Sequence, residues 1–233
     1  MQLSTILGKK ASVGWRVALA VALIAGVLAC WIAIDLADSI RHDLRDFDGH
    51  VVARIETAMW RSYYDHHQVR LFFQLTDLLR SQYHLPFWRA CNAAYYAARA
   101  AVVFQKGRSH ADYDRALPDL RRYYWIIRQA STNDFSVWGV ASLELQWWIV
   151  HRERATHDPE VLYLALAKLQ AEIYHLPEEL PGEKLWEHAR TRGEAMLLRD
   201  SHAARRTPSE AEWRRIEALL DQSWTSLHTV VAH

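Results

Sequence analysis

The sequence predicts an all-α protein, with a single N-terminal transmembrane helix followed by a bundle or a stacked helical-hairpin domain of about seven or eight helices. Glycine and proline, which favour turns and sheet corners, number only 8 and 6 among 233 residues, so long helices with few connections are expected. No stretch shows the two-residue alternation of a strand or an Asn-Gly or Asp-Gly hairpin signal. Apolar residues instead recur at helical spacing, as in Val52, Ile55, Met59 and Tyr63.

The first element is an apolar segment, residues 17–34, that carries no charge. As a helix it is about 27 Å long, which is enough to cross the hydrocarbon core of a bilayer. Basic residues precede it and aspartates dominate the sequence after it, so the positive-inside rule places the N-terminus in the cytoplasm. The predicted regions are a cytoplasmic tail at 1–16, a membrane anchor at 17–37 and an extracytoplasmic helical domain at 38–233, periplasmic if the source is bacterial.

The same segment allows a second kind of anchor, a lipoprotein signal with lipidation at Cys30. The apolar stretch continues through Trp31 and Ile32, which favours an uncleaved anchor over either a lipoprotein signal or a cleaved signal peptide. The asymmetry of the flanking charges argues against a buried core helix. The lipidated alternative stays open.

Helices of the domain are predicted from apolar periodicity and from capping signals. Asp158-Pro159 is a cap followed by proline, Thr207 and Glu210 have the spacing of a capping box, and Pro86 and Pro177 indicate further boundaries. The expected helices are 38–65, 68–84, 86–106, 111–130, 135–156, 159–175, 183–205 and 208–230, of which the first two could be continuous. Short loops between them predict antiparallel neighbours.

Four charged residues lie in apolar surroundings and are predicted to be buried: Glu56, Arg99, Glu144 and Glu194. An isolated buried charge is costly, so each should have a partner. The expected interactions are salt bridges that fix helix register. The basic partners would be Arg61, Arg89, Arg99 and Arg128.

A metal site is the alternative interpretation of these acids. Glu172 and His175 have the Glu-x-x-His spacing that puts a carboxylate and an imidazole on one helix face, as in di-iron bundles. The other ligands of a di-iron or other divalent metal centre would be Glu56, Glu144, Glu194 and His151. A second Glu-x-x-His pair is missing, since His151 lies seven residues after Glu144. The main interpretation therefore includes no cofactor.

Three pairs of adjacent aromatic residues are candidates for a surface or a pocket: Tyr95 and Tyr96, Tyr123 and Tyr124, and Trp147 and Trp148. An arginine follows each pair within helical reach. Core packing explains such pairs, and so does a pocket for a lipid, a quinone or a pigment.

Functional classes follow from what the sequence contains and lacks. It has none of the familiar catalytic motifs, and a formal net charge of +1 does not favour nucleic acid. The anchor and the 11 tryptophans predict a membrane-anchored interaction or scaffold protein, an accessory subunit with a protein partner or a second copy of itself. The alternatives are a helical metalloprotein oxidase and a carrier of an apolar ligand. A non-enzymatic role is favoured, and a partner surface should expose several tryptophans together.

Overall fold

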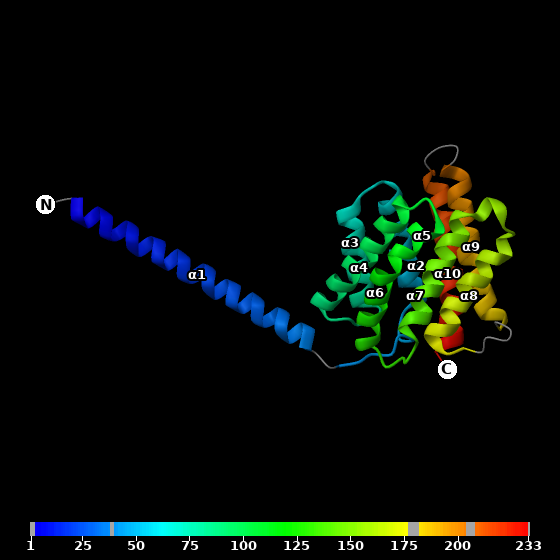
Figure 1. Cartoon of the computed structure of the whole chain (residues 1–233), viewed down its shortest axis with the longest axis horizontal. Coiled ribbons are helices and arrows are strands. Elements are labelled where there is room, and N and C mark those ends of the chain that lie inside the picture. Colours follow the sequence, from blue (N-terminus) through cyan, green and yellow to red (C-terminus); the bar gives the residue numbers. More distant parts are fainter. Residues whose placement is uncertain (1–2, 38–39, 177–181, 204–207, 233) are drawn as a thin grey trace. The chain divides into compact units, whose positions relative to one another are not determined.

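The computed structural model describes residues 3–37, 40–176, 182–203 and 208–232, and these residues form helices joined by short connections (Figure 1). Within these ranges there is no strand, only an isolated bridge between His42 and Ser131. The all-α prediction is confirmed. The chain divides into two compact units, Met1–Ser39 and Ile40–His233.

The first unit is a single long helix, α1 (Leu3–Ala37). Its part from Gly14 to Ala37 is long and apolar enough to cross a membrane once. Large apolar side chains such as Ile24 and Val27 are exposed along it, which suits a lipid environment better than water. Cys30 is also exposed on this helix, and its lipidation stays a prediction.

The second unit is a closed ring of helices, which we call the ring domain. In its described part the long helices are α2 (Gly49–Tyr64), α3 (Gln68–Ser81), α4 (Phe87–Lys106), α6 (Leu117–Gln129), α7 (Val137–Arg152), α8 (Pro159–Tyr174), α9 (Glu183–Ala203) and α10 (Glu210–Val231). Each packs against the next along the chain, and α10 returns to pack against α2 (Figure 1). The short α5 (His110–Tyr113), η1 (Asp114–Ala116) and η2 (Arg154–Thr156) lie in the connections.

The ring closes where α2 and α10 approach each other at Gly49. A Cβ atom at this position would lie 2.8 Å from the backbone nitrogen of Thr225 and 2.9 Å from the carbonyl carbon of Trp224. Distances this short are not tolerated between non-bonded heavy atoms, so only glycine allows this contact. The close approach joins the first and last helices of the ring.

Gly49→Ala is expected to lower the free energy of unfolding by about 1–3 kcal/mol, because backbone atoms of α10 would have to move. Chemical denaturation of the full chain measures this change. The control is Gly182→Ala, which places its methyl group in open space and should cost less than about 1 kcal/mol. Equal losses in the two variants would contradict the close approach at Gly49.

Several predicted boundaries need correction. The first helix of the domain begins at Gly49, not at residue 38, because the Asp48 carboxylate accepts hydrogen bonds from the backbone N–H groups of His50 and Val51 and caps it there. α2 and α3 are separate, since His66 takes a left-handed conformation between them.

The predicted start of the last helix is also wrong in its details. Ser209 and Glu212 form its capping box, two residues after the predicted pair. Thr207 and Pro177 lie outside the described residues. The predicted cap at Asp158 is confirmed, since its side chain accepts a hydrogen bond from Glu160 N over 3.0 Å.

The segment 40–48 closes one end of the ring. Leu44 and Phe47 are buried there, and the Leu44 backbone is held on both sides. Its N–H donates to Asn133 Oδ1 over 3.0 Å, and its carbonyl accepts from the Tyr174 hydroxyl over 3.2 Å. This segment therefore forms a floor for the interior of the ring.

Candidate functional site

A cavity of about 710 Å³ lies inside the ring, and every long helix of the ring contributes to its lining. Neighbouring packed helices lie about 8–10 Å apart, so a ring of this many helices has a centre wider than two facing side chains can fill. The volume falls in the range of about 300–1,000 Å³ that is typical of small-molecule sites. The cavity follows directly from the ring architecture.

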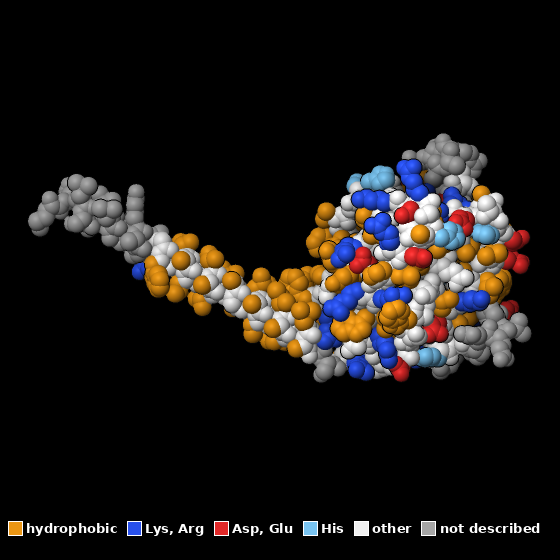
Figure 2. All heavy atoms as spheres, viewed as in Figure 1, with side chains coloured by type: hydrophobic (Ala, Val, Ile, Leu, Met, Phe, Trp, Pro, Cys, Tyr) orange, Lys and Arg blue, Asp and Glu red, His pale blue; other side chains and the backbone are white. Residues whose placement is uncertain are grey.

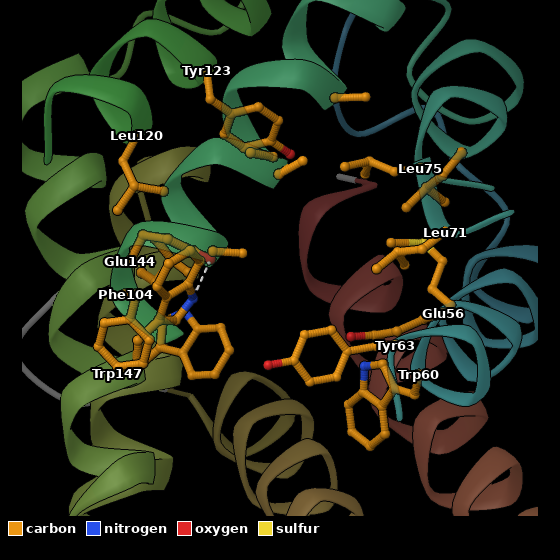
Figure 3. Close-up of a pocket in the computed structure, with 18 of the residues that line it drawn as sticks. Glu56, Trp60, Tyr63, Leu71, Leu75, Phe104, Leu120, Tyr123, Glu144 and Trp147 are labelled. Atoms are coloured by element: carbon orange, nitrogen blue, oxygen red, sulfur yellow. Dashed lines mark hydrogen bonds between the residues drawn. The ribbon is translucent and has the colours of Figure 1, made fainter. Parts of the chain in front are cut away.

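Two facing walls of the cavity are mainly apolar and aromatic (Figure 3). α2 and α3 supply one wall, with Glu56, Trp60, Tyr63, Leu71 and Leu75. α4, α6 and α7 supply the other wall, with Phe104, Leu120, Tyr123, Glu144 and Trp147. Leu44 lies at the floor, whereas the exposed lining residues Tyr63, His66 and Gln105 lie near the opposite end of the ring. We call that opposite end the mouth.

A buried ion pair joins Glu56 of α2 to Arg192 of α9. Arg192 Nη2 and Nε donate to Glu56 Oε1 over 2.7 and 3.2 Å, and Trp224 Nε1 donates to Glu56 Oε2. The two charged side chains are only 8% and 13% exposed. Burial alone would lower the pKa of Arg192. The charge and hydrogen bonds of Glu56 and the charge of Glu144 together outweigh burial, so the pKa of Arg192 is raised.

Glu144 of α7 is a half-buried carboxylate held by neutral donors. Its Oε2 accepts from the Tyr124 hydroxyl over 2.8 Å, and its Oε1 accepts from Trp148 Nε1 over 2.9 Å. No basic side chain among the described residues forms an ion pair with it. Burial first, and then the charge of Glu144, raises the pKa of Tyr124 well above its usual value, so that hydroxyl stays a donor.

Tyr123 presents its hydroxyl group to the cavity (Figure 3). Burial first, and then the charge of Glu144, raises the pKa of this phenol. The hydroxyl therefore stays protonated in neutral solution and can donate a hydrogen bond to a ligand.

A second polar cluster lies around Asp200 of α9, which also lines the cavity. Asp200 Oδ2 lies 3.0 Å from His151 Nε2 and 3.0 Å from Arg154 Nε, and its Oδ1 lies 3.4 Å from Arg199 Nη1. Burial alone would raise the pKa of Asp200. The hydrogen bond from His151 and the charges of His151 and the two arginines outweigh burial, so the pKa of Asp200 is lowered. These side chains form a cluster of one carboxylate, one imidazole and two guanidinium groups, which makes this part of the lining mainly basic.

The six residues of the predicted metal site do not converge. Glu172 Oε1 accepts from Ser136 N over 3.2 Å, and Glu194 pairs with Arg190 on its own helix. His175 ends α8 in a left-handed conformation, which breaks the helical spacing on which the motif depends, and its Nε2 lies 2.8 Å from Asp134 O. The remaining three, Glu56, Glu144 and His151, have the separate partners described above. Among the described residues no group of three His, Cys, Asp or Glu side chains is placed to hold a metal ion.

Of the four charges predicted to be buried, Glu56 and Glu144 lie in the cavity walls, whereas Arg99 and Glu194 do not. The Arg99 side chain is 51% exposed and pairs with Asp119, because the alanines beside it are too short to cover it. Two of the expected basic partners, Arg61 and Arg128, pair with other acids. Arg61 pairs with Glu210 and Arg128 pairs with Asp134, and both acids are exposed.

The aromatic pairs divide between the pocket and the surface. Tyr123, Tyr124, Trp147 and Trp148 line the cavity, whereas Tyr95 is exposed and Tyr96 is half-buried. Sequence reasoning missed Arg192, Trp60 and Phe104. Arg192 stands between Arg190 and Glu194 in a polar stretch, so nothing local indicated its burial.

Comparisons with protein-family models, with curated proteins and with solved structures find no match to this chain. The geometry of the cavity therefore carries the functional interpretation.

Proposed function

We propose that the ring domain is a binding protein for an apolar or amphipathic small molecule, held in the central cavity, and that α1 tethers it to a membrane. The observation that carries this proposal is the cavity itself, about 710 Å³ in a domain that has an extensive buried apolar core. Protein interiors contain few voids larger than a water molecule, so a space of this size with aromatic walls suits a ligand. The charge asymmetry around α1 supports an extracytoplasmic location for the domain.

The polar groups of the cavity favour ligand binding over catalysis. Glu56 is neutralised by Arg192, and Asp200 is surrounded by His151, Arg154 and Arg199. These arrangements keep the carboxylates occupied by fixed protein donors. The role in this proposal is that of a carrier or a sensor.

The test uses the full chain in lipid nanodiscs and a pair of matched double variants on α3. Leu71→Trp with Leu75→Trp narrows the cavity, whereas Val69→Trp with Phe73→Trp places the same indoles on exposed positions of the same helix. Binding of Nile red, and mass spectrometry of apolar molecules extracted from the purified chain, measure occupancy.

We expect the wild type and the outer variant to bind the dye equally, and the inner variant to lose at least about tenfold in affinity. Empty nanodiscs supply the background. Equal binding by the inner and outer variants, or binding by the wild type no greater than that of empty nanodiscs, would refute a ligand-binding cavity.

A scaffold role is the second candidate, favoured by two exposed tryptophans. Trp125 of α6 is 42% exposed and Trp138 of α7 is 65% exposed. Arg122 lies 4.3 Å from the centre of the Trp125 ring, and Arg121 lies 3.5 Å from that of Trp138. Where α6 and α7 lie in front, Figure 2 shows apolar groups bordered by Lys and Arg. Tryptophan and arginine are enriched at protein interfaces.

Native mass spectrometry of the full chain, extracted gently from its own membrane, tests the scaffold role. Additional protein subunits that are lost in a Trp125→Ala and Trp138→Ala double variant would support it. A wild-type chain that carries no other subunit would count against it. The same spectrum shows whether Cys30 bears lipid.

A further inference from the structure

Among the described residues the cavity is lined by three carboxylates and three guanidinium groups, and one of these carboxylates, that of Glu144, has no ion-pair partner. Glu56 and Glu144 face each other from opposite walls (Figure 3), and Arg192 is the guanidinium whose charge acts on both. Arg192 forms its ion pair with Glu56. Glu144 is thus left with two neutral hydrogen-bond donors and no ion pair among the described residues. A half-buried carboxylate without an ion pair favours a positively charged partner.

Aromatic side chains lie beside the Glu144 carboxylate, where such a partner would bind. Tyr124 and Trp148 contact the Glu144 carboxylate directly, and Tyr123 and Trp147 line the same wall of the cavity. The faces of aromatic rings carry negative partial charge and attract organic cations, most strongly where water is excluded. Carboxylate and rings therefore favour the same chemical group.

We infer that the ligand of the cavity is an organic cation, a protonated amine on an apolar body, with its ammonium group beside Glu144. This inference rests on the proposed ligand-binding function and specifies the class of ligand. The ammonium group would donate to the Glu144 carboxylate, because Glu56 already pairs with Arg192 and Asp200 already lies beside two arginines. The apolar body would pack against the leucines of α3 and the aromatic rings of α2 (Figure 3).

The test compares three ligands that share one hydrocarbon chain and differ in their polar group: dodecylamine, dodecanol and dodecanoic acid. Each displaces Nile red from the full chain in phosphatidylcholine nanodiscs at neutral pH, at concentrations below micelle formation. The variants are Glu144→Gln, which removes the cavity carboxylate but keeps its shape, and Glu160→Gln, which removes an exposed carboxylate outside the lining.

We expect dodecylamine to bind at least about tenfold more tightly than dodecanol, and dodecanoic acid to bind most weakly. Glu144→Gln should remove the preference for the amine, so that dodecylamine and dodecanol bind this variant within about twofold of each other, whereas Glu160→Gln should keep the wild-type preference.

The other outcomes separate the two proposals. Equal affinity for the amine and the alcohol would overturn the amine assignment and leave the binding function intact. Preference for the acid would also overturn it and would direct attention to the basic cluster around Asp200. Failure of all three to displace the dye from the wild-type chain, or failure of the chain to bind the dye at all, would overturn the ligand-binding function itself. A Glu144→Gln chain that fails to fold would bind neither dodecanol nor the dye, and this outcome identifies misfolding. In that case the comparison of dodecylamine with dodecanol on the wild-type chain decides the inference.

Discussion

Arg192→Met is expected to lower the free energy of unfolding by about 3–5 kcal/mol, because it leaves the Glu56 carboxylate buried without its cation. The ion pair is well shielded, with side-chain exposures of 8% for Glu56 and 13% for Arg192. Methionine preserves most of the side-chain volume, so the loss reports on charge and hydrogen bonding more than on packing. Chemical denaturation of the full chain, followed by tryptophan fluorescence, measures the change.

The control for this prediction is the double variant Glu56→Gln with Arg192→Met. It contains no unpaired buried charge, and a neutral replacement of a buried ion pair often costs little. The double variant should therefore recover most of the stability that the single variant loses. A double variant as unstable as the single one would mean that the geometry around Trp224, and not the uncompensated charge, controls stability here.

Acidification is expected to destabilise the ring domain through His188 by about 3 kcal/mol between pH 7.5 and pH 4.5. His188 is fully buried, and its Nδ1 lies 3.0 Å from Ser223 O. Burial first, and then the charge of Arg192, lowers its pKa from 6.5 to about 3. In the unfolded chain the imidazole takes up a proton below about pH 6.5, whereas in the folded chain it stays neutral down to about pH 3. The unfolded state therefore binds more protons in this window, so stability is greatest above pH 6.5 and falls as the pH falls.

His188→Asn isolates this contribution, because asparagine keeps a short donor near Ser223 O and does not titrate. Urea denaturation at pH 7.5, 6.0 and 4.5 compares the two chains. The difference in stability between wild type and variant should shift by about 3 kcal/mol in favour of the variant at the lowest pH. Parallel pH profiles would show that the imidazole is solvated or already protonated in the folded chain.

Both predictions concern one group of packed side chains on α9, α7 and α10. Arg192 lies near the rings of Trp147 and Trp224, and the ring of His188 packs against that of Trp224. Through these contacts α9 is joined to α2, α7 and α10 at the place where the ring closes. Arg192, Trp147 and Trp224 also line the cavity, so the stability of the ring and the shape of the ligand site depend in part on the same side chains.

The helices could be predicted because their signals are local. A cap such as Asp158 followed by proline acts within one turn, and the recurrence of apolar residues is visible within a single helix. The alternation of helices and short loops was predicted on the same basis. Where two similar caps lay close together, as at Thr207 and Ser209, the local signal did not select between them.

The site depended on contacts that local patterns do not contain. Apolar surroundings identified Glu56 and Glu144 as unusual acids, yet the partner of Glu56 lies 136 residues away in a stretch that reads as polar. The closing contact joins Gly49 to Thr225, which lie even farther apart in the sequence. The sequence by itself determined the helices, the apolar anchor helix and which acids stand among apolar residues, because helix formation and hydrophobic periodicity act over a few residues. Only the tertiary structure decided that the helices close into a ring around a cavity and that Arg192 neutralises one acid and not the other, because these outcomes depend on which distant helix faces meet.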